Sequence, residues 1–166
     1  PNLERDDNVR LGFPDPLIEV HRWSVANRKV FAEAIEASYE QTEDCPGLLG
    51  IRDIEDVIEG HKASGLFDPE MWFALTRQGE PVGVILLNPL SGRHSVELVY
   101  LGLAVPFRRK GYAWRMMQYG MAMSAARGAR TMLVAVDEQN GPALRLYRRL
   151  GFTVQGRKAA LIQTLK

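Results

Sequence analysis

The sequence predicts an α/β fold with a mixed sheet. Short apolar runs alternate with helical patterns, as at 96–105, 113–127 and 132–136, which is the strand–helix–strand order of a crossover between parallel strands. Apolar residues also recur at helical spacing in 27–39. With 166 residues, of which 46% are hydrophobic and 25% charged, the chain has the size and composition of one domain with a sizeable core.

The N-terminal part predicts one strand and two helices. The apolar and β-branched residues of 17–23 favour a strand, and the spacing in 27–39 favours an amphipathic helix. Asp53 is placed to cap a second helix at 54–64, and Gly65 is placed to end it.

The middle of the chain predicts a hairpin, a strand and a long helix. The runs at 71–77 and 81–88 are separated by a short polar turn that contains Gly79. A strand is expected at 96–105. The methionines of the helix at 113–127 lie at helical spacing, which indicates packing on the sheet.

The last part predicts a strand, a helix and two more strands. A fully apolar run at 132–136 precedes Asn140, a helix cap, and strands are expected at 152–155 and 159–165. The complete expected order is β-α-α-β-β-β-α-β-α-β-β, with no internal repeat.

An anion site is predicted where the strand at 96–105 runs into three cations at 108–110, Gly111 and the next helix. The start of a helix carries unpaired N–H groups and the positive end of the helix dipole, which together hold phosphate. Gly111 permits close approach of the backbone, and Ala113 keeps the first turn small. The segment fits neither the G-x-G-x-x-G nor the G-x-x-x-x-G-K-[ST] phosphate loop.

Two motifs in this chain resemble those of the GNAT N-acetyltransferases. Arg108-x-x-Gly111-x-Ala113 is similar to the R/Q-x-x-G-x-G/A acyl-CoA loop of that family. Residues 140–152 match its N-x-x-A-x-x-L-Y-x-x-x-G-F signature at nearly every constrained position. The motifs come in the expected order, one at a strand-to-helix turn and one opening a helix after a strand, and the resemblance covers most of the chain.

The resemblance implies a GNAT fold in which the central parallel strand pair splays after a bulge and admits the pantetheine of acyl-CoA. The pantetheine would pair with strand backbone, and the N–H groups of 109–114 would hold the pyrophosphate. Pro106 lies only two residues before Arg108, so the loop between the strand and the arginine is shorter than is usual in the family. The register of residues 103–105 against pantetheine therefore stays open. The cofactor-binding residues so implied are Leu103, Ala104, Val105, Arg108, Arg109, Lys110, Gly111, Tyr112, Ala113, Trp114 and Asn140.

Tyr147 and Glu97 are the expected catalytic residues. A phenol such as that of Tyr147 donates a proton to sulfur as the thiolate leaves, although a buried core tyrosine is the alternative. An acceptor amine is mostly charged at pH 7, so a base is needed, and Glu97 is the acid inside the central strand. Glu19 and Asp137 are the next candidates for this base. The alternative for Glu97 is a solvated residue at the strand start.

The function expected from the resemblance is direct transfer of an acetyl group from acetyl-CoA, or another acyl-CoA, to an amine of a small molecule, peptide or protein. The rival is a non-catalytic acyl-CoA-binding regulatory module. A nucleotide enzyme with an unusual phosphate loop is a second rival. The sequence identifies neither the acceptor nor the preferred acyl chain.

Charge and composition limit the kinds of partner that the sequence predicts. A net charge of +1 favours neither nucleic acid nor membrane as a partner, and the chain has no apolar run long enough to span a bilayer. The single cysteine, Cys45, fits the cytoplasm. Three scattered histidines give no metal-ligand spacing, so no metal is expected. Residues 1–16 are expected to be a linker or a disordered N-terminal segment, and 17–166 the acetyltransferase domain, with a longer parent protein and a homodimer both left open.

Overall fold

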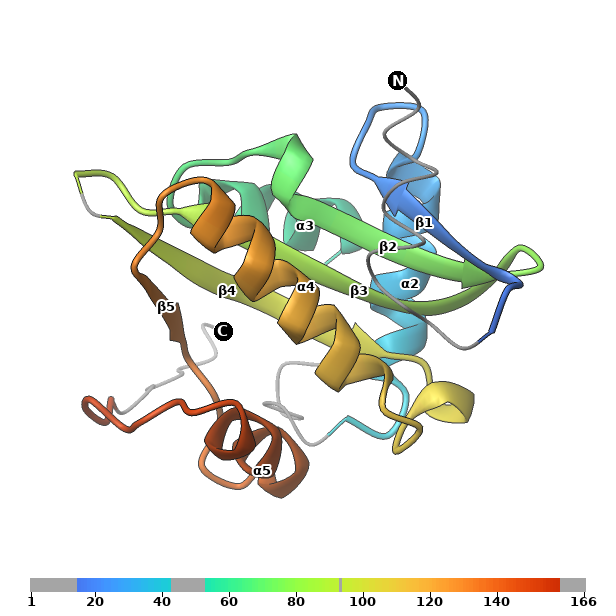
Figure 1. Cartoon of the computed structure of the whole chain (residues 1–166). Coiled ribbons are helices and arrows are strands. Elements are labelled where there is room, and N and C mark those ends of the chain that lie inside the picture. Colours follow the sequence, from blue (N-terminus) through green and yellow to red (C-terminus); the bar gives the residue numbers. More distant parts are fainter. Residues whose placement is uncertain (1–14, 43–52, 93, 159–166) are drawn as a thin grey trace, which may run out of the picture.

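The computed structural model describes residues 15–42, 53–92 and 94–158 and shows a mixed α/β fold (Figure 1). Its elements are β1 (Ile18–Arg22), α2 (Arg28–Tyr39), α3 (Ile54–Ala63), η2 (Pro69–Met71), β2 (Trp72–Arg77), β3 (Glu80–Pro89), β4 (Ser95–Leu103), η3 (Val105–Phe107), α4 (Tyr112–Ala126), β5 (Thr131–Val134) and α5 (Gly141–Arg149). The predicted fold class and the order of elements through α5 are therefore confirmed. None of the helices in these ranges is both long and apolar enough to cross a membrane.

The five strands form one sheet in the order β1-β2-β3-β4-β5. Neighbouring strands are antiparallel except for β4 and β5, which are parallel. The predicted hairpin of β2 and β3 turns through Gln78 and Gly79, whose φ angles of 52° and 83° are both left-handed. Two such residues form the turn whose twist matches that of the strands it joins.

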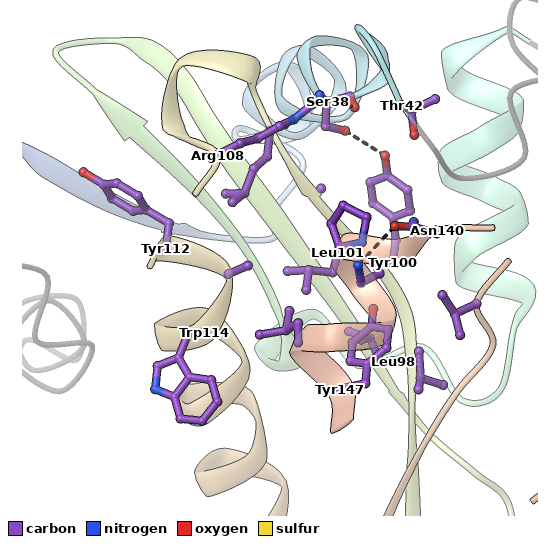
Figure 2. A pocket seen from close by; sticks show the side chains of 18 of the residues that line it. Ser38, Thr42, Leu98, Tyr100, Leu101, Arg108, Tyr112, Trp114, Asn140 and Tyr147 are labelled. Atoms are coloured by element: carbon purple, nitrogen blue, oxygen red, sulfur yellow. Dashed lines mark hydrogen bonds between the residues drawn. The ribbon is translucent and has the colours of Figure 1, made fainter. Parts of the chain in front are cut away.

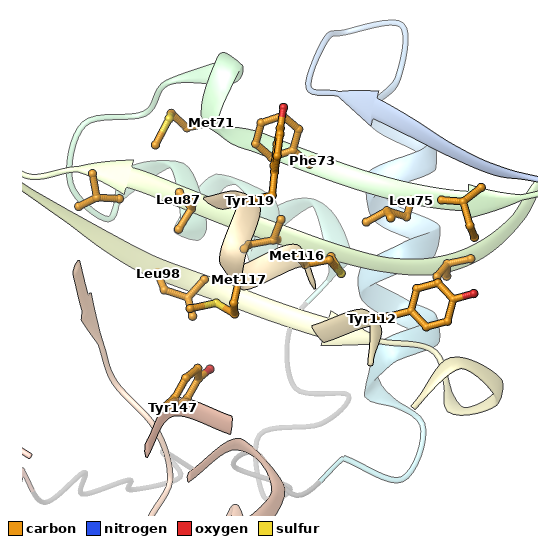
Figure 3. Packing of buried hydrophobic residues seen from close by; sticks show 14 residues of the cluster. Met71, Phe73, Leu75, Leu87, Leu98, Tyr112, Met116, Met117, Tyr119 and Tyr147 are labelled. Atoms are coloured by element: carbon orange, nitrogen blue, oxygen red, sulfur yellow. The ribbon is translucent and has the colours of Figure 1, made fainter. Parts of the chain in front are cut away.

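Helices cover both faces of the sheet (Figure 1). On one face, Met116 and Met117 of α4 pack with Leu87 and Leu98 of the sheet (Figure 3), which confirms the packing role predicted for the methionines. Gly120 lets α4 lie close to the sheet, because a Cβ there would lie 2.8 Å from Leu87 Cδ1. On the other face, α2 and α3 pack against the sheet through a second cluster of buried residues.

The parallel pair of β4 and β5 separates part of the way along β4. Pairing joins Ser95 to Thr131 and ends with Leu98 against Val134. On the opposite edge of β4 the register slips: Leu87 of β3 pairs with Leu98, and its neighbour Leu86 pairs with Tyr100. Val99 is therefore the extra residue of a β-bulge. From Val99 onward, one edge of β4 has no partner strand among the described residues.

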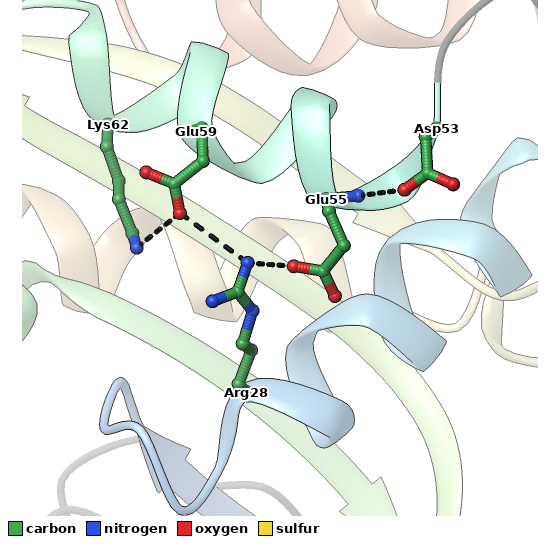
Figure 4. Close-up of polar contacts among 5 residues, drawn as sticks. All are labelled: Arg28, Asp53, Glu55, Glu59 and Lys62. Atoms are coloured by element: carbon green, nitrogen blue, oxygen red, sulfur yellow. Dashed lines mark hydrogen bonds and ion pairs between the residues drawn. The ribbon is translucent and has the colours of Figure 1, made fainter.

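A polar network on the surface joins α2 to α3 (Figure 4). Arg28 of α2 contacts Glu55 and also Glu59, the latter at 3.6 Å, and Lys62 Nζ donates to Glu59 at 2.9 Å. The hydrogen bond from Lys62 holds the pKa of Glu59 below its ordinary value. Asp53 accepts from Glu55 N–H at 2.8 Å, which confirms the predicted helix cap.

The strand predicted at 152–155 is wrong. Phe152 N–H donates to the Tyr147 carbonyl at 3.0 Å and so belongs to the end of α5, and Val154 is 71% exposed. A strand needs a neighbour that satisfies its backbone groups, and these residues have none in the described part of the chain. The strand expected at 159–165, Cys45 and nearly all of the expected linker lie outside the described residues.

Candidate functional site

A cavity of about 600 Å³ opens where β4 and β5 separate (Figure 2). Its walls come from the second half of β4, the end of β5, the first turn of α4, α5, and the last turn of α2. These segments are far apart in the sequence and meet at the point where the pairing of β4 with β5 ends. The site is therefore a product of the sheet topology, with loops and helix ends around it.

The turn from β4 into α4 forms the part of the wall that suits an anion. Arg109 and Gly111 have left-handed φ angles of 60° and 85°, and both line the cavity. Gly111 is the N-cap of α4 and brings no side chain to cap the first helical turn. Backbone turns of this kind and helix starts both present N–H groups to anions. Tyr112, Ala113 and Trp114, predicted to contribute to the same site, also line the cavity.

Arg108 lines the cavity, but its guanidinium contacts main-chain carbonyls. Nε donates to Leu103 O at 2.9 Å, Nη1 to Gln41 O at 3.1 Å, and Nη2 to Ser38 O at 3.1 Å and to Glu40 O at 2.6 Å. Of these carbonyls, that of Ser38 lies in the last turn of α2, and those of Glu40 and Gln41 belong to the two residues that directly follow the helix. The side chain predicted to bind the cofactor thus holds the end of a helix in this structure.

Other cations supply positive charge around the cavity. Arg109 and Arg145 line it, and the guanidinium of Arg149 lies 4.5 Å from the ring centre of Trp114, another lining residue. Lys110, the last of the three predicted cations, is exposed, lies 6.0 Å from the Phe107 ring and is not part of the lining. No carboxylate lines the cavity in the part of the chain that the structure describes.

The strand residues predicted to pair with pantetheine are only partly at the cavity. Leu103 lines it, whereas Ala104 and Val105 do not. Ala104 N–H donates to Val82 O at 3.0 Å, and Val105 opens a 3-10 turn with Pro106 as its second residue. The short loop that Pro106 produces therefore removes these two residues from the open edge, and residues 99–103 of β4 face the cavity instead.

Asn140, at the start of α5, and Tyr147, two helical turns further on, lie on the same face and both line the cavity (Figure 2). Asn140 Oδ1 accepts from Ala143 N–H at 3.1 Å, so its side chain caps the helix. Its amide nitrogen is a donor that the cap does not use. Tyr147 is 8% exposed, and its ring centre lies 5.6 Å from that of Phe152. The tyrosine is thus both a core residue and a cavity residue.

The three candidate acids lie away from the cavity lining. Val96 and Leu98 belong to the core on the α4 side, so Glu97 between them faces the α3 side, where Ser64 Oγ donates to its carboxylate at 3.0 Å. Glu19 is on β1, and Asp137 Oδ1 accepts from Gln139 N–H at 2.8 Å. The bulge at Val99 comes after Glu97 and does not turn it toward the cavity.

Sequence reasoning missed a cluster formed by β4 and the last turn of α2. Tyr100 and Ser38 both line the cavity, and their hydroxyl oxygens lie 2.7 Å apart. Ser38 Oγ also donates to Ile35 O at 2.6 Å, so the Tyr100 hydroxyl is the donor to Ser38. The His61 ring stacks on Tyr100 at 5.3 Å. The one tyrosine of β4, in the apolar run that follows Glu97 and two residues before Gly102, was the available signal.

Comparisons with known proteins agree with this geometry. Residues 31–152 match the model of the Acetyltransferase (GNAT) family. The chain is 30% identical over 131 residues to a mycothiol acetyltransferase of Streptomyces bingchenggensis, covering 79% of this chain and 38% of that protein. It is 28% identical over 114 residues to a streptothricin acetyltransferase of Streptomyces lavendulae, covering 69% of this chain and 58% of that protein. The chain therefore spans about two fifths of the length of the first mycothiol acetyltransferases it matches.

Solved structures share the fold. An aminoglycoside acetyltransferase from an uncultured soil metagenomic sample superposes with a TM-score of 0.67 at 22% identity, covering 89% of this chain and 99% of that one. A PaiA N-acetyltransferase of Thermoplasma acidophilum in complex with coenzyme A gives 0.63 at 19% identity, covering 85% and 92%. At these sequence identities the structural likeness establishes the common fold and does not identify a substrate for this chain.

Proposed function

Because this chain belongs to the acetyltransferase (GNAT) family, we propose that it transfers an acetyl group from acetyl-CoA to an amine acceptor. The observation that carries the proposal is the cavity itself. An anion-binding turn lines one part of it, an open strand edge another, and a tyrosine a third. Phosphate, pantetheine and thioester each have a complementary wall within one cavity of about 600 Å³.

The residues present fit coenzyme A. The turn with left-handed Arg109 and Gly111 presents backbone to the pyrophosphate, and Arg109 and Arg145 bring opposite charge. The open edge of 99–103 offers main-chain groups to the amides of pantetheine, in place of Ala104 and Val105. Asn140 adds its amide nitrogen from the start of α5. Acetyl-CoA supplies the acetyl group as a thioester.

Tyr147 is the proposed general acid. When the amine nitrogen bonds to the acetyl carbon and the C–S bond breaks, the sulfur leaves with an electron pair and accepts a proton. Tyr147 lines the cavity from α5 and has a phenol suited to donate it. The proton that the amine loses goes to water in this proposal, because the described lining holds no carboxylate.

The acceptor is proposed only as an amine. The names of the relatives refer to mycothiol, streptothricin and aminoglycosides, and these compounds define the first assay panel. Calorimetry with acetyl-CoA, paired with thiol release over that panel and over peptides with free N-termini, tests the function. Binding without release for every amine would favour the regulatory module, and competition by ATP would favour a nucleotide enzyme.

A further inference from the structure

Arg108 belongs to the turn from β4 into α4, residues 108–114, here called the cofactor loop, and its side chain also contacts the opposite wall of the cavity. Its Nη atoms donate to the carbonyls of Ser38, Glu40 and Gln41, which are at the end of α2. Its Nε donates to Leu103 O at 2.9 Å, on the last residue of β4. One planar guanidinium therefore joins three segments: the end of α2, the end of β4 and the loop itself.

The chemistry of this contact is that of a helix C-terminus. The last carbonyls of a helix have no intrahelical partner and carry the negative end of the dipole. The last turn of α2 contains no basic residue of its own. Arg108 supplies the missing cation and donors from 67 residues away along the chain. Four of the five N–H groups of the guanidinium donate to these carbonyls, which leaves one N–H group for a phosphate.

The segment held by Arg108 forms a wall of the cavity. Ser38, Gln41 and Thr42 line it, and Ser38 also bonds to Tyr100 on β4. The last turn of α2 is thus fastened to the core strand at one point and to the cofactor loop at another. A ligand that fixes the loop would, through Arg108, also fix this turn.

We propose that Arg108 is a positioning residue that couples the cofactor loop to the last turn of α2, so that coenzyme A on the loop orders the wall on the α2 side. This inference rests on the proposed function. It assigns the phosphate contacts to backbone N–H groups and to Arg109 and Arg145, and it gives Arg108 the role of connecting two walls.

The test compares the unchanged whole chain, called the parent, with three variants of it: Arg108→Gln, Arg108→Lys and Arg109→Gln. Calorimetry measures coenzyme A affinity at two salt concentrations, and hydrogen exchange measures the protection of residues 36–42 with and without saturating coenzyme A. In the parent, coenzyme A is expected to slow exchange in 36–42. Arg108→Gln should keep the affinity within about threefold and keep its salt dependence, while exchange in 36–42 rises and no longer responds to coenzyme A.

Arg108→Lys separates charge from geometry, because an ammonium keeps the charge but does not reach several carbonyls in one plane. It should resemble Arg108→Gln in exchange. Arg109→Gln is the matched phosphate-side control: it should lose about tenfold in affinity, show weaker salt dependence and retain the response of 36–42 at saturation.

Three results would overturn the coupling while leaving the proposed function intact. The first is that Arg108→Gln loses as much coenzyme A affinity as Arg109→Gln and shows the same salt dependence. The second is that coenzyme A still slows exchange in 36–42 in both Arg108 variants. The third is that coenzyme A binds the parent without changing exchange in 36–42. The last requires no variant to fold. A parent that does not bind coenzyme A at all would instead overturn the proposed function, and the coupling with it.

Discussion

The phenol oxygen of Tyr100 lies 2.7 Å from Oγ of Ser38, so the middle of β4 is bonded to the last turn of α2 across the floor of the cavity. Both residues line that cavity. Tyr100→Phe should remove this hydrogen bond and lower the free energy of unfolding by about 1 kcal/mol. Denaturant titration measures it. An unchanged free energy of unfolding would mean that the bond to Ser38 contributes nothing measurable to stability.

Gly102 makes this contact sterically feasible. A Cβ at position 102 would lie 2.8 Å from Tyr100 Cε1 and closer still to Ser38 Oγ. Gly102→Ala should therefore push α2 from β4 and cost about 1–3 kcal/mol of unfolding free energy. Gly156→Ala is the control, because a Cβ there meets nothing within 4 Å. Equal stability of the two alanine variants would contradict the close packing of α2 on β4.

Gly111→Val tests the phosphate turn. A Cβ at Gly111 meets nothing within 4 Å, so the penalty comes from its φ of 85°, which valine adopts at a cost of about 1–3 kcal/mol. The turn should distort, and acetyl-CoA affinity should fall by about tenfold or more. Gly128→Val, with the same φ and the same open space at the far end of α4, should lose similar stability and keep its affinity. Calorimetry on both folded variants decides.

Tyr147→Phe tests the proposed acid. Turnover should fall by about 10²–10⁴-fold, because the phenol proton matters as the thiolate leaves, while acetyl-CoA affinity should change by less than about threefold. Steady-state rates at saturating amine, with binding measured separately, give the two numbers. A parent-like rate would return Tyr147 to a purely packing role beside Phe152.

Glu97→Gln distinguishes two roles for the strand carboxylate. Glu97 faces α3, where Ser64 Oγ donates to it at 3.0 Å. We therefore expect the variant to keep the acidic limb of the pH–rate profile and most of its rate. Loss of that limb would restore Glu97 as the general base, acting through water from the opposite face of the sheet.

Glu59→Gln tests the ion pair between Glu59 and Lys62 on the surface of α3 through its pH dependence. The hydrogen bond from Lys62 lowers the pKa of Glu59 in the folded chain, so folding favours the charged carboxylate. Its stabilising contribution is fully present above the unfolded-state pKa and is lost as pH falls through the lower folded-state pKa. Glu59→Gln should thus have a lower Tm than the parent at pH 7, and the difference should vanish in acid. Glu138→Gln, at an exposed position, should show no such convergence.

The sequence predicted the fold through α5 because each element is specified locally. Asp53 caps α3 and Gly79 lies in the β2–β3 turn, as expected. The strand at 152–155 failed because a strand depends on a distant partner that local pattern does not encode. The short alternation of Phe152 and Val154 was equally compatible with an irregular segment.

The site was predictable where backbone geometry follows from local residues, as at Gly111 and Asn140. It was not predictable where side chains bond across the chain. The spacing of Arg108 in its motif does not show that its donors reach Ser38 and Gln41, about seventy residues earlier. In the same way, the strand position of Glu97 does not by itself say which face of the sheet it occupies. The packing of its neighbours Val96 and Leu98 on the α4 side and the bond from Ser64 settle that.

The separation of β4 from β5 has a consequence for how this chain tolerates substitution. Along 99–103 the groups offered to a ligand are peptide N–H and C=O, which are the same for almost any side chain. Mutations along this stretch can therefore reshape the neighbouring walls while the backbone edge persists. The backbone edge of 99–103 is therefore the part of the cavity least sensitive to side-chain identity, as long as the bulge at Val99 is kept.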